Sequence, residues 1–122
     1  MSIPSSPLNA LQESSLLKTQ ALINGQWVDA PQRFAVTDPA TGALLAEVPN
    51  LGAEQTEAAI AAANAAWPAW RALPPKARSA ILMKWFQLLH KHADDLARIM
   101  TAEQGKPLAE ARGEVLYGAS FV

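Results

Sequence analysis

Few side chains in this sequence could carry out chemistry, and the most reactive kind is missing. The 122 residues include two histidines and no cysteine, so a cysteine nucleophile, a disulfide and a thiolate metal site are excluded within the chain. His90 and His92 lie two positions apart, so on a helix they would point in different directions. A metal site on a helix needs histidines four positions apart and further ligands. The spacing therefore favours two partly exposed histidines near a helix end over a metal site.

Three glutamates are the remaining candidates for acid–base chemistry. Glu103 precedes a Gly-Lys pair, and Glu110 and Glu114 would share one helix face because they lie four positions apart. A catalytic carboxylate needs burial or a like-charged neighbour to shift its pKa, and a sequence alone cannot show either condition. A solvated helix face, or a salt bridge to Lys106 or Arg112, is the favoured interpretation.

The pair Gly105-Lys106 resembles the end of a phosphate-binding loop, but the rest of that motif is absent. The glycine required five positions earlier is Met100, and Pro107 stands where the motif has Ser or Thr. We therefore expect one helix to stop at Gly105 and another to start at Pro107.

The charge and the aromatic residues give no indication of a nucleic-acid partner. The formal net charge is −1, and no basic patch accompanies Trp67 and Trp70. We expect these tryptophans to pack the first long helix on the second. No apolar run reaches the length of a membrane span, and the first 20 residues do not resemble a signal or transit peptide. We expect a cytoplasmic protein without a membrane partner.

The first half of the chain reads as a loose arm followed by short strands. Residues 1–19 are predicted to form the arm, with a short helix at 8–17. Asn24-Gly25 between two apolar runs predicts a β-hairpin over 21–28, because both turn positions need positive φ. Residues 34–37 and 44–48 read as strands on either side of a turn at 38–42.

The second half is predicted to be helical. Apolar residues at helical spacing predict helices over 53–67, from Pro75 past Leu89, over 93–103 and over 107–122. Pro68 is expected to stop the first of them. The last helix carries no C-terminal cap, so we expect the chain to end inside it with unpaired carbonyls. The expected apolar faces are Ile60, Ala63 and Trp67; Ile81, Leu82, Trp85, Leu88 and Leu89; Leu96, Ile99 and Met100; Leu108, Ala111, Val115, Ala119 and Val122.

The order of several motifs resembles the N-terminal part of the aldehyde dehydrogenase superfamily. The motifs are Ile23-Asn24-Gly25-Gln26-Trp27, Asp38-Pro39-Ala40-Thr41-Gly42, Trp67-Pro68-Ala69-Trp70, the segment 78–89 and Glu103-Gln104-Gly105-Lys106-Pro107. The stretch 100–117 is most similar to bacterial succinate-semialdehyde dehydrogenases. The resemblance implies an α/β dinucleotide-binding domain, of which residues 20–122 would be an incomplete N-terminal portion, mostly helical with an N-terminal hairpin.

The resemblance also implies an activity that this chain does not itself encode. Family members oxidise aldehydes with NAD or NADP through a cysteine nucleophile and a glutamate base, and both residues lie downstream of the matching region. Tyr117 and Gly113 would line the substrate entrance. Val36 and Thr37 carbonyls with the Glu103 carboxylate would hold a monovalent cation, although a packed, hydrogen-bonded Glu103 is the alternative. The whole enzyme would be a homo-oligomer that takes a small aldehyde.

A second hypothesis remains open at this point. The chain could be a stand-alone helical interaction module without catalysis. A module would bury its apolar stripes internally, whereas a fragment would expose them as a large patch and self-associate.

Overall fold

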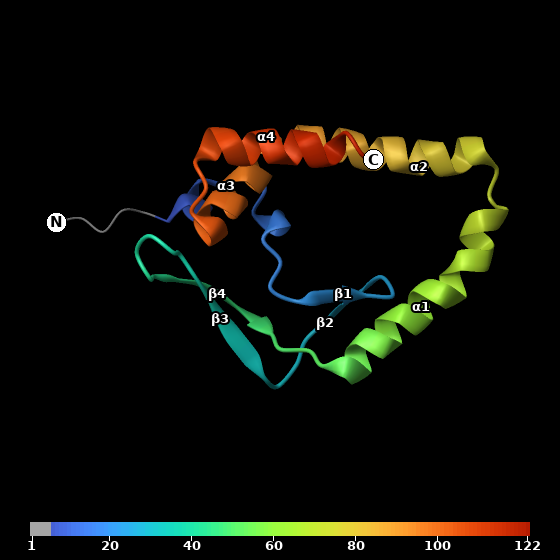
Figure 1. Ribbon diagram of the computed structural model, residues 1–122, viewed down its shortest axis with the longest axis horizontal. Coiled ribbons are helices and arrows are strands. Elements are labelled where there is room, and N and C mark those ends of the chain that lie inside the picture. Colours follow the sequence, from blue (N-terminus) through green and yellow to red (C-terminus); the bar gives the residue numbers. More distant parts are fainter. Residues whose placement is uncertain (1–5) are drawn as a thin grey trace.

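The computed structural model describes residues 6–122, which form two antiparallel hairpins and four helices (Figure 1). Helices α2, α3 and α4 lie together, and α1 leads away from them toward the hairpins. The elements are 3₁₀ turns η1 (Pro7–Ala10) and η2 (Ser14–Leu16), strands β1 (Ala21–Ile23), β2 (Gln26–Val28), β3 (Arg33–Thr37) and β4 (Leu44–Pro49), and helices α1 (Ala53–Ala72), α2 (Pro75–Lys91), α3 (Ala93–Gln104) and α4 (Leu108–Ala119).

Both predicted hairpin regions are confirmed. Strands β1 and β2 pair with Ala21 opposite Val28, and the turn residues Asn24 and Gly25 have φ of 52° and 73°. Strands β3 and β4 also pair with each other. Their turn is held by the Asp38 carboxylate, which accepts the Ala40 N–H at 2.7 Å, as expected of an Asx turn.

The arm before β1 does not contain the predicted helix. Residues 8–17 form η1 and η2 instead. The N–H groups of Gln12 and Glu13 donate to the Asp95 carboxylate on α3, so they are not available for helical bonds. The described part of the arm is therefore docked rather than loose, and residues 1–5 of the arm lie outside the described residues. The division into an arm of 1–19 and a domain portion of 20–122 stays a prediction.

The prediction that Pro68 stops the first long helix is wrong. Helix α1 continues to Ala72, and Leu73 then adopts an extended conformation with ψ of 141° before Pro74. A proline within a helix leaves the carbonyl four residues earlier without its N–H partner. Asn64 is exposed, so water can bond its carbonyl. The stop comes at Leu73 because a residue before proline disfavours helical ψ.

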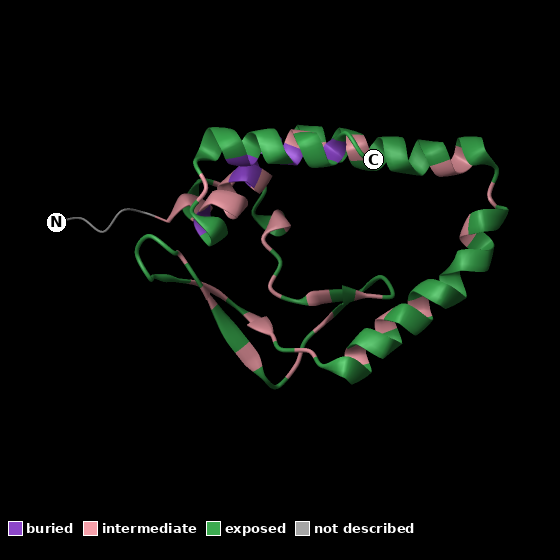
Figure 2. Ribbon diagram, in the orientation of Figure 1, coloured by how far each residue is buried: buried purple, intermediate pink, exposed green. Residues whose placement is uncertain are grey.

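The core consists almost entirely of alanine side chains where α3 and α4 pack together (Figure 2). The buried apolar residues are Ala93, Ala97, Ala102, Ala111, Val115 and Ala119. The predicted stripe on α4 is thus confirmed at its three middle positions, whereas Leu108 is 46% exposed. Among the described residues, none on α1 or α2 is buried. Most of the apolar faces predicted for these two helices therefore face solvent.

The prediction that the last helix runs to residue 122 with unpaired carbonyls is also wrong. Helix α4 ends at Ala119, and the Ser120 N–H donates to the Leu116 and Tyr117 carbonyls at 3.1 Å. The next two N–H groups donate to Gly118 and Ala119 carbonyls. Tighter bonds of this 3₁₀ type satisfy the end of the helix without a glycine cap. Within residues 6–122, no helix combines the length and apolarity needed to cross a bilayer.

Candidate functional site

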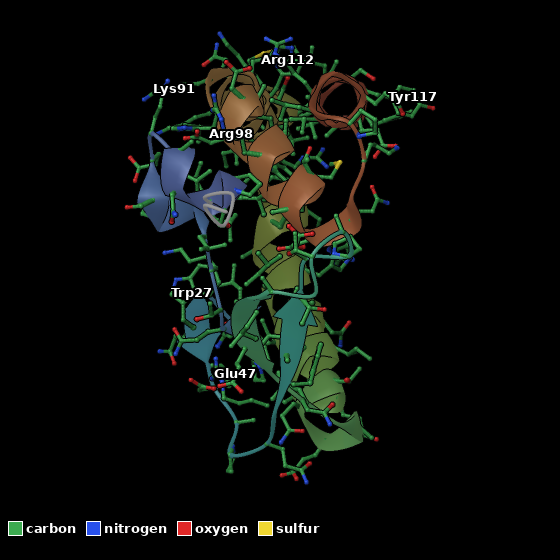
Figure 3. The ribbon with its side chains drawn as sticks, turned by 90° about the vertical axis from the view of Figure 1, so that its left-hand side faces the viewer. Trp27, Glu47, Lys91, Arg98, Arg112 and Tyr117 are labelled. Atoms are coloured by element: carbon green, nitrogen blue, oxygen red, sulfur yellow. The ribbon has the colours of Figure 1, made fainter. Side chains whose placement is uncertain are left out.

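The two residues expected at a substrate entrance lie on the outer face of α4. Gly113 and Tyr117 are one helical turn apart, opposite the face that carries the buried Ala111 and Val115. Tyr117 is 67% exposed and points away from α3 (Figure 3). Its ring meets the Phe121 ring edge-on, with centroids 4.9 Å apart. A Cβ added at Gly113 would meet nothing within 4 Å, so this face has open space beside an aromatic pair.

The turn between β3 and β4 touches the link between α3 and α4. Gly105 ends α3 in the left-handed conformation with φ of 78°, as predicted from its position after the helix. A Cβ added at Gly105 would lie 3.0 Å from Cγ of Pro39. This contact brings the end of β3, with Thr37, toward the end of α3, with Glu103. Glu103 is exposed in this chain.

Replacement of Gly105 tests this junction. We expect Gly105→Ala to lower the free energy of unfolding by about 1–3 kcal/mol, because alanine is strained at positive φ and its methyl group would press on Pro39. Gly113→Ala is the matched control, since it lies within a helix beside open space and should stabilise by about 0.5–1 kcal/mol. Urea midpoints of the two variants measure both effects. Equal urea midpoints for Gly105→Ala and the parent would contradict the close contact between Gly105 and Pro39.

Gly105, Lys106 and Glu114 have structural roles where α3 is joined to α4. The Gly105 N–H donates to the Thr101 carbonyl at 2.9 Å, so this glycine closes a helix. The Lys106 ammonium is paired with the Glu114 carboxylate, which confirms the predicted salt bridge for Glu114. Arg112 does not join it, because its Nε donates to Oδ1 of Asp94 at 2.7 Å.

The histidines and tryptophans do not build a site. His90 stacks on Phe86 with ring centroids 4.2 Å apart, and His92 joins α2 to α3. Over residues 6–122, no group of His, Cys, Asp or Glu side chains has an arrangement suited to a metal ion. Trp67 is half exposed, so the expectation that it packs α1 on α2 is wrong. Figure 1 shows that these two helices diverge from the connection at Leu73.

The structure contains one buried carboxylate that the sequence does not predict. Asp95 is 4% exposed and is the only buried charged residue in the described part of the chain. Its carboxylate accepts N–H groups from Gln12 and Glu13 and faces the Arg98 guanidinium at 3.2 Å. The two backbone hydrogen bonds, with Arg98, lower the pKa of Asp95 below its ordinary value of 3.8. An acidic residue in a first helical turn is only a weak signal of such a group, because the N–H donors lie more than 80 positions away along the chain.

An apolar groove of ≈ 530 Å³ runs between α2, α3 and α4. Its lining includes Trp85, Leu89, Leu96, Ile99, Met100, Val115 and Val122. The largest of these side chains, Trp85, is 55% exposed. The groove is therefore an uncovered apolar surface rather than a core.

Comparison with known proteins assigns the class of protein. Residues 27–122 match the model of the aldehyde dehydrogenase family, and the chain belongs to this family. The matched residues include most of β2, the whole of β3 and β4, and the four helices.

Particular relatives narrow the similarity to semialdehyde dehydrogenases. The chain is 59% identical over 114 residues to the NADP-dependent succinate-semialdehyde dehydrogenase of Escherichia coli and 54% identical to the glutarate-semialdehyde dehydrogenase of Pseudomonas putida. Each alignment covers 92% of this chain and 24% of the relative. The chain thus spans about a quarter of the length of these curated relatives.

Solved structures agree with the sequence comparisons. The succinate-semialdehyde dehydrogenase of Burkholderia pseudomallei superposes with a TM-score of 0.88 at 53% identity, over 92% of this chain and 24% of that one. An NADP-dependent enzyme of E. coli gives 0.89 at 58% identity over 91% and 24%. The hairpins and helices described above are therefore the N-terminal part of an aldehyde dehydrogenase fold.

Proposed function

We propose that these residues are the N-terminal portion of an NAD(P)-dependent dehydrogenase that oxidises succinate semialdehyde or a similar small aldehyde with an anionic end. The observation that carries the proposal is the 59% identity to a succinate-semialdehyde dehydrogenase across 92% of the chain. Other relatives are named for glutarate semialdehyde and 3-sulfolactaldehyde. These three substrates share an aldehyde at one end and an anionic group at the other.

In this proposal the chain positions the substrate and performs no chemical step. The family reaction needs a thiolate to attack the aldehyde, and the chain has no cysteine. The nicotinamide cofactor would accept the hydride, and no residue of this chain is assigned to hold it. The part played here is the scaffold of α3 and α4, with Gly113 and Tyr117 forming one wall of the substrate entrance.

The proposed cation site has less geometric support than the proposed substrate entrance. Val36 is half-buried, and Thr37 and Glu103 are exposed. The contact between Pro39 and Gly105 draws their two segments together, and carbonyl and carboxylate oxygens suit a hard cation. We expect a higher melting midpoint in sodium chloride than in choline chloride at equal ionic strength, and we expect Glu103→Gln to abolish this difference. A difference that persists unchanged in this variant would count against these ligands.

The whole enzyme is proposed to be a cytoplasmic homo-oligomer with no nucleic-acid or membrane partner. The net charge of −1 offers no attraction for polyanions. The alternative of a stand-alone helical module finds less support, because large apolar side chains on α1 and α2 that such a module would bury, among them Ile60, Ile81 and Trp85, are exposed.

A hybrid enzyme tests the proposed function. This chain would replace the matching segment of the E. coli succinate-semialdehyde dehydrogenase, with the rest of that enzyme unchanged. We expect the hybrid to oxidise succinate semialdehyde with NADP at a kcat/KM within roughly tenfold of the parent, a change of about 1.4 kcal/mol in the barrier. A hybrid that folds and binds NADP but turns over neither succinate nor glutarate semialdehyde would refute the proposal.

The same hybrid tests the entrance wall. Gly113→Trp should fill the open space on the outer face of α4 and lower kcat/KM by about 100-fold, mainly by blocking access. Glu57→Gln, an exposed change on α1, is the control and should have no effect. An unchanged kcat/KM for Gly113→Trp would remove Gly113 from the entrance.

A further inference from the structure

The N-terminal segment over residues 6–17, called the strap here, is held to α3 by one buried carboxylate. The Gln12 N–H lies 3.1 Å from both carboxylate oxygens of Asp95, and the Glu13 N–H lies 2.8 Å from Oδ2. Arg98, one turn further along α3, pairs with Oδ1 at 3.2 Å. Two consecutive backbone donors thus share one acceptor group that is 4% exposed.

The rest of the strap is attached through partly exposed residues. Its 3₁₀ turn η1 packs on α3, but no residue of the strap is buried. The strap pairs with neither hairpin. Hydrogen bonds to a charged acceptor are stronger than neutral ones, so the bonds to Asp95 are the main polar attachment of the segment.

We propose that the strap opens and closes over α3 as one unit, and that the ionised Asp95 carboxylate is the clasp that keeps it closed. Opening breaks the bonds from Gln12 and Glu13 and leaves the α3–α4 pair intact, because the buried alanines of that pair lie on other elements. A polar pocket of ≈ 240 Å³ already separates the strap from the junction of α2 and α3. Water can therefore reach the clasp from that side.

Charges on each neighbouring element bear on the clasp. Glu13 belongs to the strap, Arg98 and Asp94 to α3, Lys91 to the end of α2, and His92 to the link between the two helices. Figure 3 labels Lys91 and Arg98. Asp94 points outward to Arg112 and makes no bond to the strap. The Gln12 and Glu13 hydrogen bonds depress the pKa of Asp95, so the closed strap is fully stabilised above pH 3.8. The stabilisation is lost as pH falls through the lower pKa of the folded state. Acid should therefore open the strap.

Hydrogen exchange of the hybrid enzyme, which carries these residues within a complete fold, tests the clasp. In Asp95→Asn, which keeps the side-chain shape and removes the charge, amides of residues 12–17 should exchange roughly tenfold faster at neutral pH. Amides of α3 and α4 should keep their rates. Asp94→Asn is the matched control, since it removes a neighbouring carboxylate that does not touch the strap, and it should leave residues 12–17 unchanged.

A second variant approaches the clasp from the strap. Gln12→Pro removes one of the donated N–H groups without altering α3 and should speed exchange of residues 13–17 by a similar factor. In the double variant the two effects should not add, because both break the same contact. The proposal is overturned if Asp95→Asn leaves strap exchange unchanged, or if α3 and α4 lose protection by the same factor as the strap. It is also overturned if the effects of the two variants are fully additive.

Discussion

Incubated with succinate semialdehyde and either NAD or NADP, the 122-residue chain is expected to form no reduced cofactor above a buffer blank. The covalent step of the family reaction needs a thiolate, and the chain contains no cysteine. Enzymes accelerate reactions by at least about a millionfold, so the loss should amount to the whole catalytic effect. Absorbance of the reduced nicotinamide measures it, with the active hybrid enzyme as the positive control.

Cofactor affinity provides a second measurement for the same prediction. The family's pyrophosphate is held by a glycine-rich turn at the start of a helix, and this chain has no such sequence. Calorimetric titration should therefore show no binding tighter than about 1 mM, whereas specific cofactor sites bind well below that concentration. Turnover that rises in proportion to chain concentration, or a micromolar dissociation constant, would show that residues of this chain form a site after all.

The second large effect concerns association of the isolated chain. We expect the chain to be helical but loosely packed, and to self-associate. Several of the exposed large side chains lie on faces where helices normally bury them: Ile60 at 64%, Trp67 at 50%, Ile81 at 51%, Trp85 at 55% and Leu88 at 43%. Burial contributes about 25 cal/mol per Å². Several hundred Å² left uncovered therefore represent roughly 5–10 kcal/mol, comparable to the stability of a whole domain.

Sedimentation velocity and thermal melting measure this prediction. Trp85→Glu places a charge in the apolar groove and should shift the population toward monomer, whereas Gln87→Glu, on the same helix outside the groove lining, should not. A parent chain that is monomeric, melts in one sharp transition and gives dispersed side-chain NMR signals would instead favour the independent helical module.

Local signals in the sequence predicted most elements correctly, because each depends on neighbouring residues. Asn24-Gly25 and Asp38 determine their turns through their own backbone and side-chain geometry. Gly105 ends α3 for the same kind of reason. Pro68 is one of the exceptions, since helix propensity after it and a solvated carbonyl before it let α1 continue.

Burial and the clasp could not be predicted, because both depend on contacts between distant segments. Periodicity identifies an apolar face but not whether a partner covers it, so Trp85 was expected to be buried and is half exposed. The buried carboxylate of Asp95 depends on N–H groups 82 and 83 positions away. Tyr117 and Gly113 became candidate site residues only through the resemblance to a family, since neither residue type by itself indicates a substrate entrance.

The alanine contact between α3 and α4 has a mechanical consequence. Ala97, Ala111 and Ala119 are buried where α3 and α4 pack, and such small side chains allow two helices to approach closely. Any larger side chain at these positions would push α4 outward as a rigid rod. Because Gly113 and Tyr117 lie on the opposite side of α4, they would move with the helix by the same distance. The spacing of two backbones, set by three of the smallest side chains, thus limits which substitutions the interior tolerates without displacing the outer face of α4.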